Sequence, residues 1–240
     1  KSGYIKSGKA SGYMRYIATR EGVEKLAGNG AVTKGQRELI QKLLHDFPDA
    51  AELFEYEDYC KTPTLGTASA FITMALDANL HEIDSESGYM QYIATRPRVQ
   101  KHGSHGLFSS STSVDLASAM SELEAHEGNV WTIIYSLRRE DAARLEFDNA
   151  DAWRTLLMEN APTLAKSMKI SLNNFHWYAA FHDEGHHPHI HMMVWSDDPK
   201  EGFLTKGGIA AMRSKLTNAI FRDEMQQIYE RKDVAYSDLV

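Results

Sequence analysis

The first third of the chain has the apolar spacing of amphipathic helices. Leucine and isoleucine recur three and four residues apart over 35–46, and helix-like sequence continues over 50–60 and 66–80. Gly28–Gly30 and Lys61–Pro63 interrupt this pattern, because glycine and proline disfavour helix interiors. The sequence therefore predicts three helices between these breaks.

The middle of the chain changes from helical to strand-like patterning. A Gly- and Ser-rich stretch at 102–112 predicts a loop, and 113–127 predicts a helix with Ser113 as its N-cap. The run 129–137 is rich in β-branched and aromatic residues, which favours a strand.

The last third mixes both patterns. A helix is predicted over 148–168 with an interruption near Pro162, and another over 209–232. Between them, 175–182 and 189–195 read as two strands joined by a short polar link, which indicates a hairpin. Strands and helices do not alternate regularly, so we predict an α+β fold with an antiparallel central sheet flanked by helices.

One internal repeat stands out. SGYMRYIATR at 11–20 recurs as SGYMQYIATR at 87–96, with nine identities in ten positions. The apolar positions of each copy fit one helix face, and a duplicated packing element is the simplest explanation. The copies are separated by 76 residues with different flanks, which excludes a solenoid repeat.

Composition is that of a globular protein, with 42% hydrophobic and 25% charged residues in 240. The single cysteine, Cys60, cannot form an intramolecular disulfide. The sequence has no apolar run of membrane-spanning length and no signal-peptide pattern, so we expect a cytoplasmic protein. We expect residues 1–240 to form a single domain, trimmed from a longer protein because the chain begins with Lys1.

Charge is unevenly distributed along the chain. The formal net charge is −7, which argues against a general nucleic-acid coat protein. Residues 1–40, however, hold eight basic and three acidic residues, a net charge of +5. An anionic partner is therefore expected to meet this N-terminal segment first.

Five of the eleven histidines lie within ten residues, in the sequence FHDEGHHPHIHMMVW. His189 and His191 share one face of a predicted strand, because side chains two residues apart point the same way. His182, at the end of the preceding strand, can reach the same face. Three imidazoles then converge on one divalent cation. Asp183 or Glu184 could accept a hydrogen bond from one of these rings and fix its tautomer without binding the metal.

Three functions are compatible with this cluster. Imidazole ligands favour Zn, Mn, Co or Ni over Mg, as in a zinc hydrolase or in a phosphodiester transferase with a tyrosine nucleophile. Residues 187–191 also fit the alternating histidine pattern of histidine-triad nucleotide hydrolases, with His189 as the nucleophile and no metal. His186 and His187 lie in the predicted link, where we expect solvated side chains.

Three motifs resemble the MobP/MobL-type conjugative relaxases, which are HUH endonucleases of plasmids and integrative elements. The spacing of six residues between His182 and His189, followed by His191, is similar to their third motif. YIATREG, beginning at Tyr16, is similar to their first motif, whose tyrosine is the nucleophile. The 129–137 strand resembles the middle motif, with Ser136 at the position of a serine near DNA.

The resemblance implies an HUH relaxase domain that nicks single-stranded DNA at an origin of transfer and forms a 5′-phosphotyrosyl intermediate. Tyr16 is then the nucleophile, with Tyr92 in the repeated copy as the alternative, and Arg15, Arg20 and Ser136 contact DNA. The metal in cells is Mn or Mg, while Zn, Co or Ni bind in vitro. Accessory relaxosome proteins and a coupling protein are the implied partners.

Other interpretations remain open. A replication initiator or transposase would share the histidines, and a DNA-binding accessory domain that has lost catalysis would share the fold. Arg138 and Arg139, which follow the middle motif, are further candidates for phosphate contacts.

Overall fold

A four-stranded antiparallel sheet forms the centre of the protein in the computed structural model, which describes residues 30–79, 86–95, 98–101, 103–111, 113–184, 187–222 and 224. The strand order is β1-β3-β4-β2, and every neighbouring pair is antiparallel. The strands are β1 (Leu107–Phe108), β2 (Trp131–Ser136), β3 (Phe175–His182) and β4 (His189–Ser196). The predicted α+β fold is confirmed.

The two central strands, β3 and β4, form the predicted hairpin. Their register pairs Phe175 with Ser196 at one end and His182 with His189 at the other. Alternation along β4 sends Ile190 and its even-numbered neighbours to one face and His189 and its odd-numbered neighbours to the other. The register therefore fixes which side chains meet the helices on each face.

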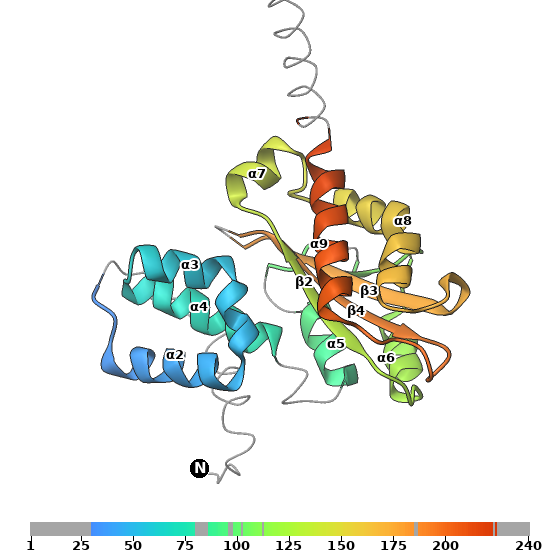
Figure 1. Cartoon of the computed structure of the whole chain (residues 1–240), viewed down its shortest axis with the longest axis horizontal. Helices are drawn as coiled ribbons and strands as arrows, with labels where there is room; N and C mark the ends of the chain where they lie inside the picture. Colours follow the sequence, from blue (N-terminus) through green and yellow to red (C-terminus); the bar gives the residue numbers. More distant parts are fainter. Residues whose placement is uncertain are drawn as a thin grey trace, which may run out of the picture.

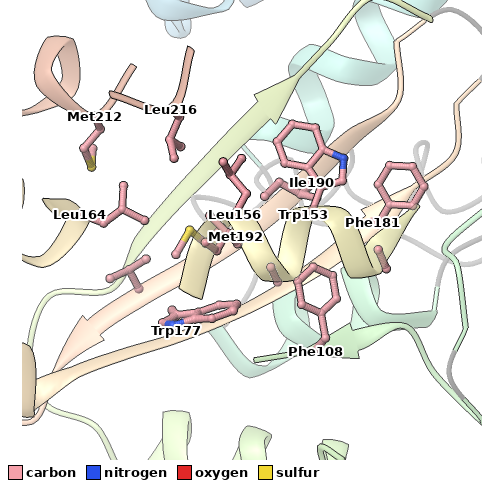
Figure 2. Close-up of a cluster of buried hydrophobic side chains, with 14 of the residues drawn as sticks. Phe108, Trp153, Leu156, Leu164, Trp177, Phe181, Ile190, Met192, Met212 and Leu216 are labelled. Carbon is pink, nitrogen blue, oxygen red and sulfur yellow. The ribbon is translucent and has the colours of Figure 1, made fainter. Parts of the chain in front are cut away.

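Helices cover both faces of the sheet (Figure 1). On one face, α8 (Ala150–Ser167) and α9 (Lys206–Ile220) enclose the large core shown in Figure 2, which includes Trp153 and Trp177. On the opposite face, α5 (Glu86–Thr95) and α6 (Leu116–Glu124) pack against the odd-numbered residues of β4. The histidines therefore lie beneath α5 rather than in the large core.

A helical unit with its own small core lies beside the β2 edge of the sheet (Figure 1). It consists of α2 (Lys34–Asp46), the 3₁₀ turn η2 (Pro48–Glu52), α3 (Phe54–Lys61) and α4 (Leu65–Ala78). Capping boxes begin α2 and α4, because Thr33 and Thr64 each accept a backbone N–H of the first turn. The helices predicted over 35–46 and 66–80 correspond to α2 and α4, whereas the helix predicted over 50–60 is divided into η2 and α3, because Leu53 between them has an extended backbone.

Three local predictions need correction. Helix α8 runs without a break through Pro162, whose side chain is exposed, so the lost backbone hydrogen bond faces solvent. Helix α6 begins after Asp115 rather than Ser113, because the Asp115 carboxylate accepts the Ser118 N–H. The predicted 102–112 loop contains β1, which pairs with β3.

Several shorter features were also missed or fall outside the described ranges. The helix α7 (Arg139–Arg144) and the 3₁₀ turn η4 (Leu172–Asn174) were not predicted. The final helix, predicted over 209–232, begins earlier, at Lys206, and its predicted last turns lie outside the described residues. Among the described helices, none is long and apolar enough to cross a membrane.

Candidate metal centre

Three histidines from two adjacent strands converge on the face covered by α5. His182 ends β3 directly opposite His189, which begins β4, and His191 follows two residues later on the same face. All three residues are 0% exposed. Their ring centroids lie 4.7 to 5.2 Å apart, and one ligand nitrogen from each ring lies within 4.8 Å of the others. The predicted convergence of these side chains is confirmed.

Backbone carbonyls define the tautomers of two of these rings. Nε2 of His182 lies 2.8 Å from the Ile93 carbonyl oxygen, and Nδ1 of His189 lies 2.9 Å from the His187 carbonyl oxygen. A carbonyl oxygen only accepts, so both of these nitrogens carry hydrogen. The opposite nitrogens, Nδ1 of His182 and Nε2 of His189, are buried and present lone pairs suited to a metal.

The third ring contacts a tyrosine of the repeated sequence. Nδ1 of His191 lies 2.9 Å from the hydroxyl oxygen of Tyr89, which is itself fully buried in α5. If Nε2 of His191 binds a metal, Nδ1 carries the hydrogen and donates it to Tyr89. Sequence reasoning missed this contact, although the internal repeat marked the segment that provides it.

The carboxylates expected near the histidines form ion pairs with arginines. Glu184 lies 2.5 Å from Arg98, and Asp183 lies 2.5 Å from Arg139. The hydrogen bonds of the three ring nitrogens described above go instead to two carbonyls and a phenol. An orienting role for Glu184 stays a prediction.

Arg138 and Arg139, considered for phosphate contacts, neutralise acids of the chain itself. Arg138 bonds to Glu57 at 2.9 Å and to Asp58 at 3.3 Å, which joins the end of β2 to the helical unit. Arg139 bonds to Asp183 and to the carbonyl of Glu184. Both side chains are therefore committed to structural ion pairs in the absence of DNA.

Ser136 is placed beside the histidines by the strand register. It pairs with His189 across β2 and β4, and paired residues of antiparallel strands point to the same face. Its hydroxyl is buried and makes no hydrogen bond within the described residues. On the opposite face, burial raises the pKa of Tyr135 far above that of a free phenol, which keeps its hydroxyl protonated.

The candidate nucleophiles differ in how far the structure describes them. Tyr92, half-buried on α5, donates a hydrogen bond to the fully buried carboxylate of Asp77 at 3.1 Å. Tyr16, Arg15 and Arg20 lie outside the described residues, as does His186. Their predicted roles therefore stay predictions.

His187 was expected to be solvated and is buried, with 4% exposure. Its Nε2 lies 2.7 Å from a carboxylate oxygen of Asp58, and its ring packs against Phe54 with centroids 5.4 Å apart. Both partners belong to α3 of the helical unit, which the sequence alone could not place beside the histidines. The link between β3 and β4 is therefore anchored to a distant segment.

The residues present fit a divalent metal. The donor set consists of three buried imidazoles with their orientations fixed by second hydrogen bonds, as is typical of metal-binding histidines. Such a set suits Zn, Mn, Co or Ni and leaves coordination positions for water or substrate. Together, the sheet and this cluster define an α+β protein with a three-histidine candidate metal centre.

Comparison with known protein families matches residues 3–240 to the MobL relaxases. The chain therefore belongs to the MobL relaxase family, whose members are DNA-nicking enzymes that bind single-stranded DNA. Comparisons with curated proteins and with solved structures found no match.

Proposed function

We propose that this chain nicks one DNA strand at an origin of transfer by metal-assisted tyrosine transesterification, with Tyr16 as the nucleophile. The observation that carries the proposal is the convergence of His182, His189 and His191 in a chain of the MobL relaxase family. A metal held by these histidines supplies positive charge for the oxygens of the scissile phosphate.

The reaction exchanges one phosphodiester for another. The Tyr16 oxygen forms a bond to phosphorus while the bond from phosphorus to the 3′ oxygen breaks. The phenol proton ends on the released 3′ hydroxyl, and the 5′ phosphate stays joined to the protein. Because a phenol with a pKa of about 10 is a weak nucleophile at neutral pH, it needs a base or nearby positive charge.

Phosphate binding by Arg15 and Arg20 is favoured by the charge distribution. The first 40 residues have a net charge of +5 in a chain whose total is −7. Arg138 and Arg139, in contrast, form ion pairs with acidic residues of the chain itself. We propose that the N-terminal basic segment positions the DNA backbone and that Ser136 contacts it beside His189. A short basic segment that contacts few phosphates should bind DNA weakly, so the complex should dissociate at low salt concentrations.

A covalent adduct tests the nucleophile. The protein is incubated with Mn²⁺ or Mg²⁺ and single-stranded oligonucleotides spanning the origin of transfer of its element, and SDS-resistant complexes are measured. Tyr16→Phe should abolish the adduct while DNA binding persists, and Tyr92→Phe, the matched control in the repeated copy, should retain it. An adduct that survives in Tyr16→Phe and disappears in Tyr92→Phe would assign the nucleophile to Tyr92.

Metal binding requires a separate measurement. Wild-type protein should bind one Mn²⁺, Co²⁺ or Zn²⁺ per chain, and His189→Ala with His191→Ala should abolish it. Nicking that continues undiminished in EDTA would overturn metal assistance. The histidine-triad alternative predicts hydrolysis of a nucleoside phosphoramidate in EDTA.

We further propose that residues 1–240 act as a single relaxase domain in the bacterial cytoplasm. Accessory relaxosome proteins and a coupling protein are the proposed partners. Identifying the proteins that co-purify with the chain on an origin-containing plasmid tests the proposed partners, and a single cooperative unfolding transition of residues 1–240 tests the single domain.

A further inference from the structure

We propose that Asp58 of the helical unit is a positioning residue for the metal centre and acts on His189 through His187. This inference rests on the metal centre of the proposed function and extends it to a helix that supplies none of the three histidines. It assigns the helical unit a part in metal binding.

A continuous chain of contacts leads from α3 to the centre. The Asp58 carboxylate accepts a hydrogen bond from Nε2 of His187 at 2.7 Å. The backbone carbonyl of the same His187 accepts a hydrogen bond from Nδ1 of His189 at 2.9 Å. The opposite nitrogen of His189 belongs to the three-histidine group. Fixing the side chain of His187 therefore fixes the carbonyl that orients a ligand ring.

The backbone around His187 is well suited to transmit this restraint. Pro188 follows it, so the peptide plane carrying the His187 carbonyl lacks an N–H, and His187 is restricted to extended conformations. The Pro188 carbonyl in turn accepts the Leu137 N–H at 3.1 Å from the end of β2. The hydrogen bond from Leu137 thus holds the segment at Pro188. The contact between Asp58 and His187 restricts the movement of the preceding residue.

Asp58 is itself held in place by its surroundings. Arg138 bonds to its carboxylate at 3.3 Å and lies over the ring of Phe54, with 5.0 Å from the guanidinium carbon to the ring centroid. Phe54 also packs against His187. The carboxylate is thus oriented by a cation on one side while it accepts the imidazole on the other, which favours a single geometry.

Metal affinity is the direct test. Removing the hydrogen-bond partner of a ligating histidine lowers metal affinity by roughly 10- to 100-fold. Removing a residue that holds this partner in place should have an effect at the lower end of that range. We expect Asp58→Ala to raise the Kd for Co²⁺ or Zn²⁺ about 10-fold in the full chain. Asp58→Asn, which keeps an acceptor oxygen, should restore most of this affinity. Glu57→Gln is the matched control, because Glu57 bonds to Arg138 but not to His187.

A second variant keeps the test decisive if Asp58→Ala fails to fold. His187→Phe retains the ring packing on Phe54 and removes the hydrogen bond to Asp58, so it should weaken metal binding to the same extent. The double variant should be no weaker than either single variant, because both break one linkage. Nitrogen-15 NMR should also show that the Nδ1 hydrogen of His189 exchanges faster in each variant.

The outcomes separate this inference from the proposed function. Folded Asp58→Ala and His187→Phe proteins with wild-type Kd values and unchanged His189 signals would overturn the inference and leave the metal centre intact. Wild-type protein without stoichiometric metal binding would overturn both. A decrease in affinity in Glu57→Gln equal to that in Asp58→Ala would assign the effect to general loosening of α3 and also overturn it.

Discussion

The hydroxyl oxygen of Tyr89 lies 2.9 Å from Nδ1 of His191, and both side chains are fully buried. Tyr89 belongs to the second copy of the internal repeat, so this copy contributes a side chain to the candidate centre. The contact with the imidazole already engages the Tyr89 hydroxyl. We therefore expect Tyr89 to orient His191 and not to act as the nucleophile.

Tyr89→Phe should weaken metal binding about 10-fold, because it removes the oxygen that holds the ligand ring. The covalent DNA adduct should form poorly at limiting metal and recover at saturating metal, as titration with Mn²⁺ can measure. Tyr92→Phe, three residues along the same helix, should leave the metal Kd unchanged. Complete loss of adduct at saturating metal in Tyr89→Phe would contradict a positioning role.

The histidine site was predictable because its determinants are local. His189 and His191 share a strand face by the two-residue period, and the short link to His182 makes an antiparallel hairpin the simplest connection. The packing partners were not predictable in this way. Tyr89 and Asp58 reach the histidines from segments 102 and 129 residues distant from their partners, and no local pattern specifies such contacts.

Helix boundaries show a similar division between local rules and context. Proline disfavours helix interiors, so an interruption was predicted near Pro162. Pro162 is exposed on α8, and water can replace the backbone hydrogen bond that proline cannot make. The first residue of α6 depended on which of two nearby capping residues, Ser113 or Asp115, accepts a backbone N–H. β1 has only two residues, too few for a period-two pattern, and forms because β3 offers an edge.

Glu55 should make stability decrease as pH rises. Burial, with the nearby carboxylates of Asp58, Glu184 and Asp77, raises the pKa of Glu55 from 4.5 to about 7. The folded state therefore favours the protonated acid. The contribution of Glu55 to the free energy of unfolding is most favourable below pH 4.5 and decreases as the pH rises through about 7. Relative to wild type, Glu55→Gln should gain up to about 3 kcal/mol of unfolding free energy between pH 4.5 and pH 8.

Urea unfolding of both proteins at the two pH values measures this difference. Glu57→Gln is the control on the same helix, because its exposed carboxylate has a pKa lowered mainly by Lys61. Removing a carboxylate of that kind should not produce a gain that grows with pH. An equal difference between Glu55→Gln and wild type at both pH values would show that the folded-state pKa of Glu55 is close to normal.

Gly208 marks a close approach between α8 and α9. A Cβ atom at this position would lie 2.4 Å from the Ser167 carbonyl oxygen, so alanine would force the helices apart. At neighbouring Gly207 the nearest atom would lie 3.9 Å away, which leaves room for a methyl group. Gly207→Ala should therefore stabilise the fold by up to ~1 kcal/mol, from helix propensity alone.

Gly208→Ala should instead destabilise the protein by about 2 kcal/mol, because backbone displacement outweighs the same propensity gain. Chemical unfolding of the two variants measures the contrast directly. Equal stabilisation by both substitutions would mean that α8 and α9 are further apart in solution than their contact at Ser167 indicates.

Substitution of Ser136 should lower activity without lowering stability. Its hydroxyl is buried without a hydrogen bond in the described residues, although the side chain shares a sheet face with His189. Ser136→Ala should therefore leave the free energy of unfolding unchanged or raise it by up to ~1 kcal/mol, since it removes a buried polar group. If the hydroxyl bonds to DNA, adduct formation should fall about 10-fold, as expected for one hydrogen bond to a charged group.

Adduct yield and urea unfolding of the same preparation provide the two measurements. Ser109→Ala is a useful control, because Ser109 is buried on β1's flank and its hydroxyl accepts the Ser111 N–H. That substitution should lower stability and leave adduct formation unchanged at temperatures where the protein stays folded. If Ser136→Ala proves stable and fully active, Ser136 has no role at the DNA, and its place beside His189 reflects packing of β2 against β4 alone.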